Sequence, residues 1–372
     1  LRPGDFPMIY RILRYGAFLI ILGLGIGYLS FWPVPIAPVA WEAEENPGFT
    51  GPYAANTTLA ALEILPLGED QHGPEDIAVD ADGVVWTTSE QGELYRLEPG
   101  GEVTHVGRLG NRPLGLEPAP DGGLYIADSF IGLLHWSLEE GTKVLVDEVR
   151  SIPLRYANQL AVASDGRVFF SVSTTRFDPL EYGGTLATSV LDILEHRQTG
   201  YVAVYHPDGE VDIVAEGFSF TNGVALTPEE DALLIVETAT YSVWKHWLTG
   251  EKAGTRELIL SNLPAYPDNL QAQGDGTFWL GLVSPRPASI DLLAPYPALR
   301  RLILRLPEAV RPAPIPYAAL LRIDADGTVL AAPQDPSGAY FLTTGAQIVD
   351  GDLIVSSLGA PGLGRMPASA LD

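Results

Sequence analysis

One short pattern recurs along the chain and constrains the fold more than any other feature. An oxygen-bearing side chain is followed seven residues later by a turn pair, and then by an apolar, strand-like segment. The pattern begins at Glu75, Asn158, Asn222 and Asp268, and its turn pairs are Asp82-Gly83, Asp165-Gly166, Glu229-Glu230 and Asp275-Gly276. If the units form a ring, these four side chains converge on its axis. Convergent carboxylate and amide oxygens are ligands that suit a hard cation such as Ca²⁺.

Two further segments complete the repeat. One contains Asp121-Gly122, and the other runs from Gln347 to Leu358. Each unit has short β-type runs joined by tight turns, at a period of about 40 residues that insertions lengthen. We therefore predict an all-β chain, a six-bladed β-propeller. A ring must be closed, and residues 58–67, which precede the first unit, are expected to supply the outer strand of the sixth blade.

The N-terminus has a different character. No charged residue occurs from Tyr15 to Trp41, and prolines follow the apolar run. Residues 15–32 are long enough for a transmembrane helix. Arginines precede this segment and glutamates follow it (Arg2, Arg11, Arg14; Glu42, Glu44, Glu45). The positive-inside rule then places the N-terminus in the cytoplasm and the propeller in the periplasm, or in the lumen or outside a eukaryotic cell. The alternative is a cleaved signal peptide, for which the run is long.

These boundaries predict four regions. They are a cytoplasmic tail (1–14), a transmembrane helix (15–32), a Pro-rich linker (33–57) and the propeller (58–372). Two insertions interrupt the propeller, at 176–199 and 284–317, and both have helical spacing of apolar residues. Insertions of this length are typical of lids or binding loops. A membrane partner could contact the 284–317 insertion or the small-residue face of Gly23 and Gly27.

Composition excludes several classes of function. The formal net charge is −25, so the chain lacks the basic surface that nucleic-acid binding needs. There is no cysteine, which excludes disulfides, thiolate metal sites and a cysteine nucleophile. The six histidines have no metal-site spacing.

Several motifs together resemble the strictosidine synthase-like family, to which the adipocyte plasma membrane-associated proteins also belong. They are Arg112-Pro-Leu-Gly-Leu116, the run from Leu124 to Leu133, Phe220-Thr-Asn-Gly-Val-Ala-Leu226, Glu237-Thr-Ala-Thr240, the run from Trp247 to Gly254, and Leu263-Pro-Ala-Tyr-Pro-Asp-Asn-Leu270. The resemblance covers roughly residues 58–360. It implies membership of the senescence-marker-protein, gluconolactonase and paraoxonase superfamily of six-bladed propellers.

The resemblance also implies a metal site. Metal-binding members of the superfamily hold Ca²⁺ on the propeller axis with one Glu, two Asn and one Asp, which here correspond to Glu75, Asn158, Asn222 and Asp268. Asn269 is a candidate fifth ligand. The histidine pair of the paraoxonases is absent, because the matching positions are Leu114 and Ser129. The plant synthase works without metal.

The function that follows is a membrane-anchored, Ca²⁺-dependent hydrolase of lactones or carboxylic esters. Asp268 is the candidate nucleophile or general base, because it is a carboxylate beside the expected metal. Candidate pocket residues are His72, Asp128, Tyr156, Phe220 and Tyr266. Two alternatives stay open: a non-catalytic scaffold in a membrane complex, and a metal-free lyase or condensing enzyme like the plant synthase.

Overall fold

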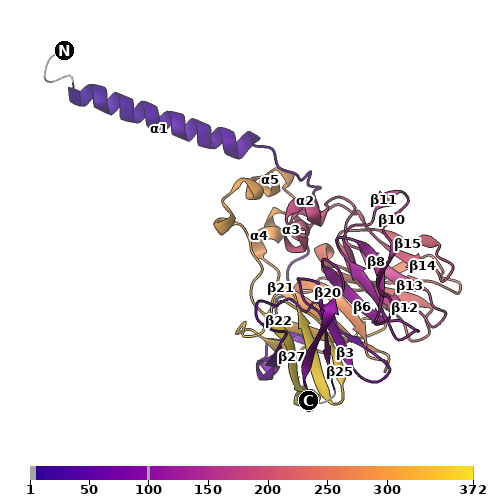
Figure 1. The fold of residues 1–372 in the computed structure, drawn as a ribbon. Helices are drawn as coiled ribbons and strands as arrows, with labels where there is room; N and C mark the ends of the chain where they lie inside the picture. The colour runs from indigo at the N-terminus through magenta and orange to yellow at the C-terminus, as the bar shows by residue number, and fades with distance from the viewer. Residues whose placement is uncertain (1–5, 99–100, 372) are drawn as a thin grey trace.

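Antiparallel sheets follow one another along the chain and form the blades of a ring (Figure 1). The computed structural model describes residues 6–98 and 101–371. From the inner to the outer strand, the first three blades are β2 (Ala78–Val79), β3 (Val85–Thr88), β4 (Glu93–Leu97) and β5 (Val103–Arg108); β6 (Pro113–Pro118), β7 (Leu124–Asp128), β8 (Gly132–Ser137) and β9 (Gly141–Val146); and β12 (Ala157–Val162), β13 (Val168–Val172), β14 (Gly200–Tyr205) and β15 (Val211–Phe218). A small hairpin, β10 (Glu148–Val149) and β11 (Ile152–Pro153), lies between the second and third blades.

The remaining blades follow the same order. They are β16 (Thr221–Leu226), β17 (Ala232–Glu237), β18 (Ser242–Trp247) and β19 (Arg256–Leu260); β20 (Ala265–Ala272), β21 (Thr277–Pro285), β22 (Ala318–Asp324) and β23 (Val329–Ala331), with β24 (Gln334–Asp335) also on β22; and β25 (Thr343–Val349), β26 (Asp352–Ser357), β27 (Gly362–Pro367) and β1 (Glu63–Pro66). The predicted six-bladed β-propeller is confirmed.

The N-terminal strand closes the ring, as the sequence predicted. β1 pairs antiparallel with β27, so Glu63 lies opposite Arg365 and Pro66 lies opposite Gly362. The last blade therefore combines strands from the two ends of the propeller. The radial arrangement of the blades leaves only short outer edges, which limits the edge-to-edge pairing through which β-proteins aggregate.

The turn pairs of the repeat connect the inner two strands of each blade. In the first blade, the Oδ1 atom of Asp80 accepts hydrogen bonds from the amides of Asp82 and Val84, both at 3.0 Å. Gly83 has φ of 80°, a left-handed conformation that glycine adopts without steric cost. The short turn keeps the two strands adjacent and fixes where the inner strand begins.

A β-bulge interrupts the inner strand at the same place in five blades. The register shifts lie between Pro113 and Gly115, Ala157 and Leu160, Thr221 and Val224, Pro267 and Leu270, and Thr343 and Gly345. A bulge inserts an extra residue and re-aims the side chains beside it. The side chains at these positions, among them Asn158, Asn222 and Asp268, therefore leave the alternating pattern of the sheet.

The two insertions form a helical lid, which we define as residues 176–199 and 284–317. The first contains α2 (Pro179–Tyr182) and α3 (Thr185–Glu195), and the second contains α4 (Ala288–Leu293), α5 (Pro297–Arg305) and the 3₁₀ turn η4 (Glu308–Val310). Apolar residues of both insertions pack on one another, among them Phe177, Leu194, Ile290 and Ile303. Figure 1 shows the lid helices side by side, between the long N-terminal helix and the blades.

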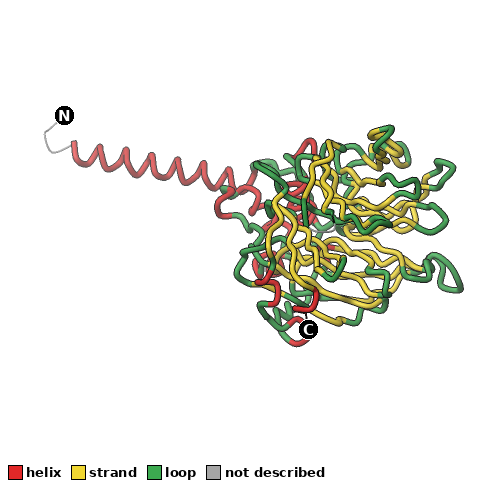
Figure 2. Tube along the Cα trace, turned by 60° about the horizontal axis from the view of Figure 1, so that its bottom comes forward, coloured by secondary structure: helices red, strands yellow, loops and turns green. Residues whose placement is uncertain are grey.

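The N-terminal helix α1 (Phe6–Phe31) begins before the apolar run and continues through Arg11 and Arg14. It projects away from the propeller (Figure 2), and none of the most apolar window of its segment Tyr10–Phe31 is buried in the structure. Its length and hydropathy would allow it to cross a membrane. Arg2 of the predicted tail lies outside the described residues.

The linker is extended, but it packs against the lid. Ile36 is buried in the lid core, and the amide of Val39 donates to the carbonyl of Glu195 at 2.9 Å. The buried guanidinium of Arg300 donates to the carbonyl oxygens of Val39 and Leu194. The linker then continues through the 3₁₀ turns η1 (Gly51–Tyr53) and η2 (Thr58–Ala61) to β1. Linker and lid thus form one packed unit.

Candidate functional site

The structure brings the four repeated oxygen-bearing side chains to one place. Glu75, Asn158, Asn222 and Asp268 are all buried, and all four line a single cavity of about 710 Å³ between the inner strands and the lid. A volume of this size is ordinary for a small-molecule site. The equivalent position in the second blade is Leu114, which has no ligand oxygen. Thr344 fills it in the sixth blade, and its hydroxyl donates to the carbonyl oxygen of Glu75 at 2.6 Å.

Three of the four side chains present an oxygen that has no hydrogen-bond partner among the described residues. The amide nitrogens of Asn158 and Asn222 donate to the hydroxyls of Ser173 and Thr238 at 3.0 and 3.2 Å, which fixes both amides. The Oδ1 atoms of Asn158, Asn222 and Asp268 are buried and have no donor among the described residues. Buried acceptors normally find a donor or an ion, so these oxygens suit a bound cation. Among the described residues no three His, Asp or Glu side chains gather as a metal site, and the oxygens here come from two carboxylates and two amides.

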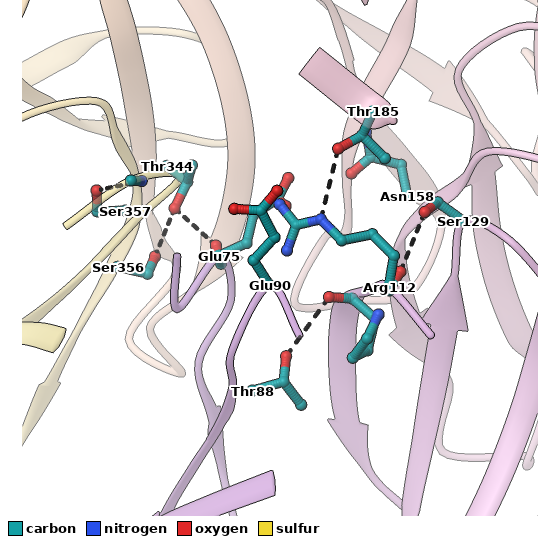
Figure 3. Close-up of polar contacts among 12 residues, drawn as sticks. Glu75, Thr88, Glu90, Arg112, Ser129, Asn158, Thr185, Thr344, Ser356 and Ser357 are labelled. Carbon is teal, nitrogen blue, oxygen red and sulfur yellow. Dashed lines mark hydrogen bonds and ion pairs between the residues drawn. The ribbon is translucent and has the colours of Figure 1, made fainter. Parts of the chain in front are cut away.

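Glu75 differs from the other three, because it already has a cationic partner. The Nη2 atom of Arg112 donates to its Oε2 atom at 3.0 Å, and each side chain is 4% exposed. Figure 3 shows the guanidinium of Arg112 reaching Glu75 from the second blade, with Thr185 of the lid on its other side. Arg112 belongs to the family motif, but the sequence did not indicate where its long side chain points.

Burial dominates the electrostatics of the site. Removal from water raises the pKa of Asp268 to about 7, although a hydrogen bond from Asn222 acts in the opposite direction. Burial also raises the pKa of Glu75 well above its usual range, and the positive charge of Arg112 limits this rise. Both carboxyls therefore gain from a nearby cation. A metal ion would add to the positive charge that Arg112 supplies.

Three predicted site residues lie outside the cavity. Asn269 is fully buried, and its amide nitrogen donates to the carbonyl of Glu75 at 3.0 Å. His72 is half-exposed and pairs with Glu90, which does line the cavity, at 2.8 Å. Asp128 accepts hydrogen bonds from the amides of Asn111, Arg112, Phe130 and Ile131. Asp128 thus orders the loop that carries Arg112 and does not contact the cavity.

The three predicted aromatic residues line the cavity. Tyr156, Phe220 and Tyr266 each precede one of the repeated oxygen-bearing residues by two positions. Tyr156 and Phe220 have φ of 58° and 61°, a conformation that is rare for residues with a side chain and often marks a functional site. The hydroxyl of Tyr156 donates to the carbonyl of Thr185 at 2.8 Å. This bond connects the floor of the cavity to the first residue of α3.

A polar network that the sequence did not indicate supports the inner strands. Asp76 accepts from the amide of Leu116 and from the side chain of Gln271, and burial raises its pKa to about 7. The Oε1 atom of Gln159 accepts from the amides of Val224 and Leu270 at 3.0 and 2.9 Å. These residues follow the repeated oxygen-bearing positions in the sequence, so the network fixes the strands that carry those side chains.

The lid supplies an apolar wall opposite this polar floor. The lid residues that line the cavity include Leu186, Val190, Ile193, Ile290, Ile303 and Leu304. The site therefore presents oxygen atoms at its base and hydrocarbon above them. A ligand that fits both parts has a polar group and an apolar group.

Comparison with known proteins agrees with this architecture. Residues 51–97 match the family described as "Strictosidine synthase-like, N-terminal", and residues 158–251 match the family "Strictosidine synthase". The adipocyte plasma membrane-associated protein of Bos taurus is 30% identical, over 95% of this chain and 89% of the relative. Strictosidine synthase-like protein 3 of Arabidopsis thaliana is 31% identical, over 75% of this chain and 78% of the relative.

Solved structures share the propeller at low sequence identity. A gluconolactonase from Xanthomonas campestris has a TM-score of 0.59 at 16% identity, over 90% of this chain and 98% of that chain. The calcium-binding protein regucalcin from Agrobacterium tumefaciens has a TM-score of 0.56, also at 16% identity, over 82% and 92% of the two chains. These two structures show a common fold. The sequence matches alone establish that the chain belongs to the strictosidine synthase-like family, together with the adipocyte plasma membrane-associated proteins.

Proposed function

We propose that this chain is a membrane-anchored, calcium-dependent hydrolase of lactones or carboxylic esters. The observation that carries the proposal is the set of buried, unpartnered oxygens at the base of an apolar cavity. Its fold is that of a gluconolactonase and of a calcium-binding propeller protein, and this likeness agrees with both parts of the proposal.

Glu75, Asn158, Asn222 and Asp268 would hold the calcium ion. When bound, the ion supplies a Lewis acid that polarises the carbonyl oxygen of an ester or lactone. The chain's own groups orient the substrate and exclude water. The lid covers the cavity, while Tyr156 and Phe220 form an edge-to-face pair, 5.3 Å between ring centroids, beside the ligands.

Asp268 is the candidate base or nucleophile. It is a buried carboxylate that lines the cavity, so it lies where a bound substrate would be. A carboxylate has two oxygens, so Asp268 could bind the ion through one of them and use the other to accept a proton or to attack a carbonyl carbon. The catalytic role and the ligand role thus fall on one carboxylate.

The membrane part of the proposal rests on α1. Its apolar segment Tyr10–Phe31 could span a bilayer, and several relatives are named plasma membrane-associated. Arg11 and Arg14 lie at its N-terminal end, which favours a cytoplasmic N-terminus and a propeller on the other side. Contacts with a membrane protein through Gly23 and Gly27, or through the 284–317 insertion, are part of the same proposal.

A hydrolysis panel tests the catalytic proposal directly. The full chain in detergent should cleave aryl esters or lactones, and Asp268→Asn should reduce the rate about 100-fold or more. Asp121→Asn, a change in an exposed turn, is the matched control and should keep the wild-type rate. Retained hydrolysis in Asp268→Asn would remove Asp268 from the mechanism.

The competing function is a non-catalytic scaffold. The outer face of the lid favours it, because Leu292, Tyr296 and Val310 are 72%, 55% and 63% exposed and could contact a partner. In that case the wild-type chain would show no turnover with any ester or lactone, and a membrane protein would copurify with it. Leu292→Glu should then release the partner.

A further inference from the structure

The buried ion pair between Arg112 and Glu75 has a consequence for metal binding. Three of the four candidate ligands present an oxygen that has no partner among the described residues, whereas the fourth, Glu75, is already bound to a cationic side chain. We propose that Arg112 is a built-in counter-cation of the axial site, and that a divalent cation must displace its guanidinium from Glu75 in order to bind. This inference rests on the calcium site of the proposed function, but not on hydrolysis.

The backbone of Arg112 is fixed by hydrogen bonds on both its amide and its carbonyl, whereas its buried guanidinium makes few hydrogen bonds. Asp128 accepts from its amide at 3.0 Å, and Ser129 donates its hydroxyl to its carbonyl at 3.1 Å. In the guanidinium, only the bond to Glu75 is short; the bond from Nε to the hydroxyl of Thr185 is 3.4 Å long. The buried Nη1 atom has no acceptor among the described residues. The group that must move is thus the least constrained part of the residue.

Electrostatics makes the two cations competitors. A guanidinium that donates to a carboxylate occupies a lone-pair direction that a calcium ion also needs. Two positive charges at one buried carboxylate repel each other strongly, because the interior screens poorly. Without any cation, however, Glu75 would be a buried, unpaired charge, which is costly. Arg112 therefore stabilises the metal-free site and lowers its affinity for metal.

A second carboxylate lines the same cavity as Glu75. Glu90 lines the same cavity, and Figure 3 shows its carboxylate directed toward Arg112 beside Glu75. Its Oε2 atom already pairs with His72 at 2.8 Å. A guanidinium has several donors in one plane and can change acceptors by a small rotation of its side chain. Glu90 would thus receive Arg112 when the metal takes Glu75.

The test is calcium affinity, measured by isothermal titration calorimetry on the full chain in detergent. Arg112→Gln removes the charge but keeps a hydrogen-bond donor, and we expect it to bind Ca²⁺ at least tenfold more tightly than wild type. Arg112→Lys keeps the charge and should stay close to wild type. An unchanged or weaker affinity in Arg112→Gln, or no Ca²⁺ binding in any variant, would overturn the proposal.

A second variant tests the receiving carboxylate and does not depend on the folding of Arg112→Gln. Glu90→Gln should weaken Ca²⁺ binding severalfold, because the displaced guanidinium loses its acceptor. Glu93→Gln, which removes an acidic residue of the same blade outside the cavity, is the matched control. Equal affinities for these two variants would contradict the displacement. Because no substrate is used, these results are independent of whether the chain hydrolyses esters.

Discussion

The indole ring of Trp41 stacks on the imidazole of His196, with ring centroids 4.1 Å apart and planes at 6°. Trp41 belongs to the linker, and His196 ends the lid helix α3. Burial, together with the positive charge of Arg300, lowers the pKa of His196 from 6.5 to about 3. The imidazole is therefore neutral when the linker is packed on the lid. This contact makes the packing of linker on lid sensitive to acid.

We expect His196 to lower the free energy of unfolding of the wild-type chain as the pH is lowered. The unfolded chain takes up a proton near pH 6.5 and the folded chain does so only near pH 3, so acid favours unfolding between these values. The slope is at most about 1.4 kcal/mol per pH unit. His196→Asn keeps a residue that tolerates the left-handed conformation but does not titrate.

Denaturant unfolding at pH 7.5 and 5.0 measures this effect as the difference between wild type and His196→Asn. The comparison is needed because buried carboxyls such as Asp76, with pKa raised to about 7, contribute with the opposite sign. If the two proteins lose equal stability on acidification, His196 is not the responsible group.

Calcium should stabilise the native chain. A ligand bound only by the folded state raises stability by about 2.7 kcal/mol at 100 times its Kd. We expect added Ca²⁺ to raise the melting temperature and a chelator to reverse the change. Asn222→Leu removes one of the unpartnered oxygens and should abolish most of the shift. An equal calcium shift in Asn222→Leu would exclude this residue as a ligand.

The propeller was predictable because its signals are local. The seven-residue interval between Asp268 and Asp275 reflects one inner strand and one tight turn, and the same geometry is required in every blade. The convergence of the repeated oxygen-bearing side chains then follows from the ring. These features need no knowledge of distant contacts.

The remaining features depend on contacts between distant segments. The direction of the Arg112 side chain is set by Glu75 and Thr185, which are 37 and 73 residues away in the chain. The linker looked like a free spacer because its proline content indicates extended backbone, but Trp41 and Ile36 pack on insertions that follow much later. Asp128 lies in a family motif, and its position alone did not distinguish loop ordering from ligand contact.

A close approach between the fourth and fifth blades should make Gly223 intolerant of a side chain. A Cβ atom at this position would lie 2.6 Å from the carbonyl oxygen of Asp268 and 2.6 Å from the amide nitrogen of Leu270. We expect Gly223→Ala to cost about 1–3 kcal/mol of unfolding free energy, since both contacts are to backbone. Denaturant titration measures it, and a loss below about 0.5 kcal/mol would show that the blades can separate freely.

The orientation of the chain can be determined with a reporter at the C-terminus. Because arginines precede the apolar segment of α1 and glutamates follow it, we expect a fused periplasmic reporter to be active and a cytoplasmic one to be silent. Replacing Arg11 and Arg14 by glutamate should weaken this preference. Release of the full-length protein by high salt would refute a membrane span.

The apolar wall of the cavity should set the preference for the acyl group of an ester. Leu186 lies on α3, lines the cavity and is 50% exposed, whereas Leu180 on α2 is 57% exposed and is not among the lining residues. Because both are largely exposed, Leu186→Glu and Leu180→Glu should both fold. A charge in the wall opposes the burial of a hydrocarbon chain, so Leu186→Glu should raise the KM for an octanoyl ester about tenfold and change the KM for an acetyl ester little. Leu180→Glu should leave both values unchanged. If the two substitutions change KM equally, the acyl chain does not lie against α3. The same conclusion follows if Leu186→Glu changes the KM for the octanoyl and the acetyl ester by the same factor.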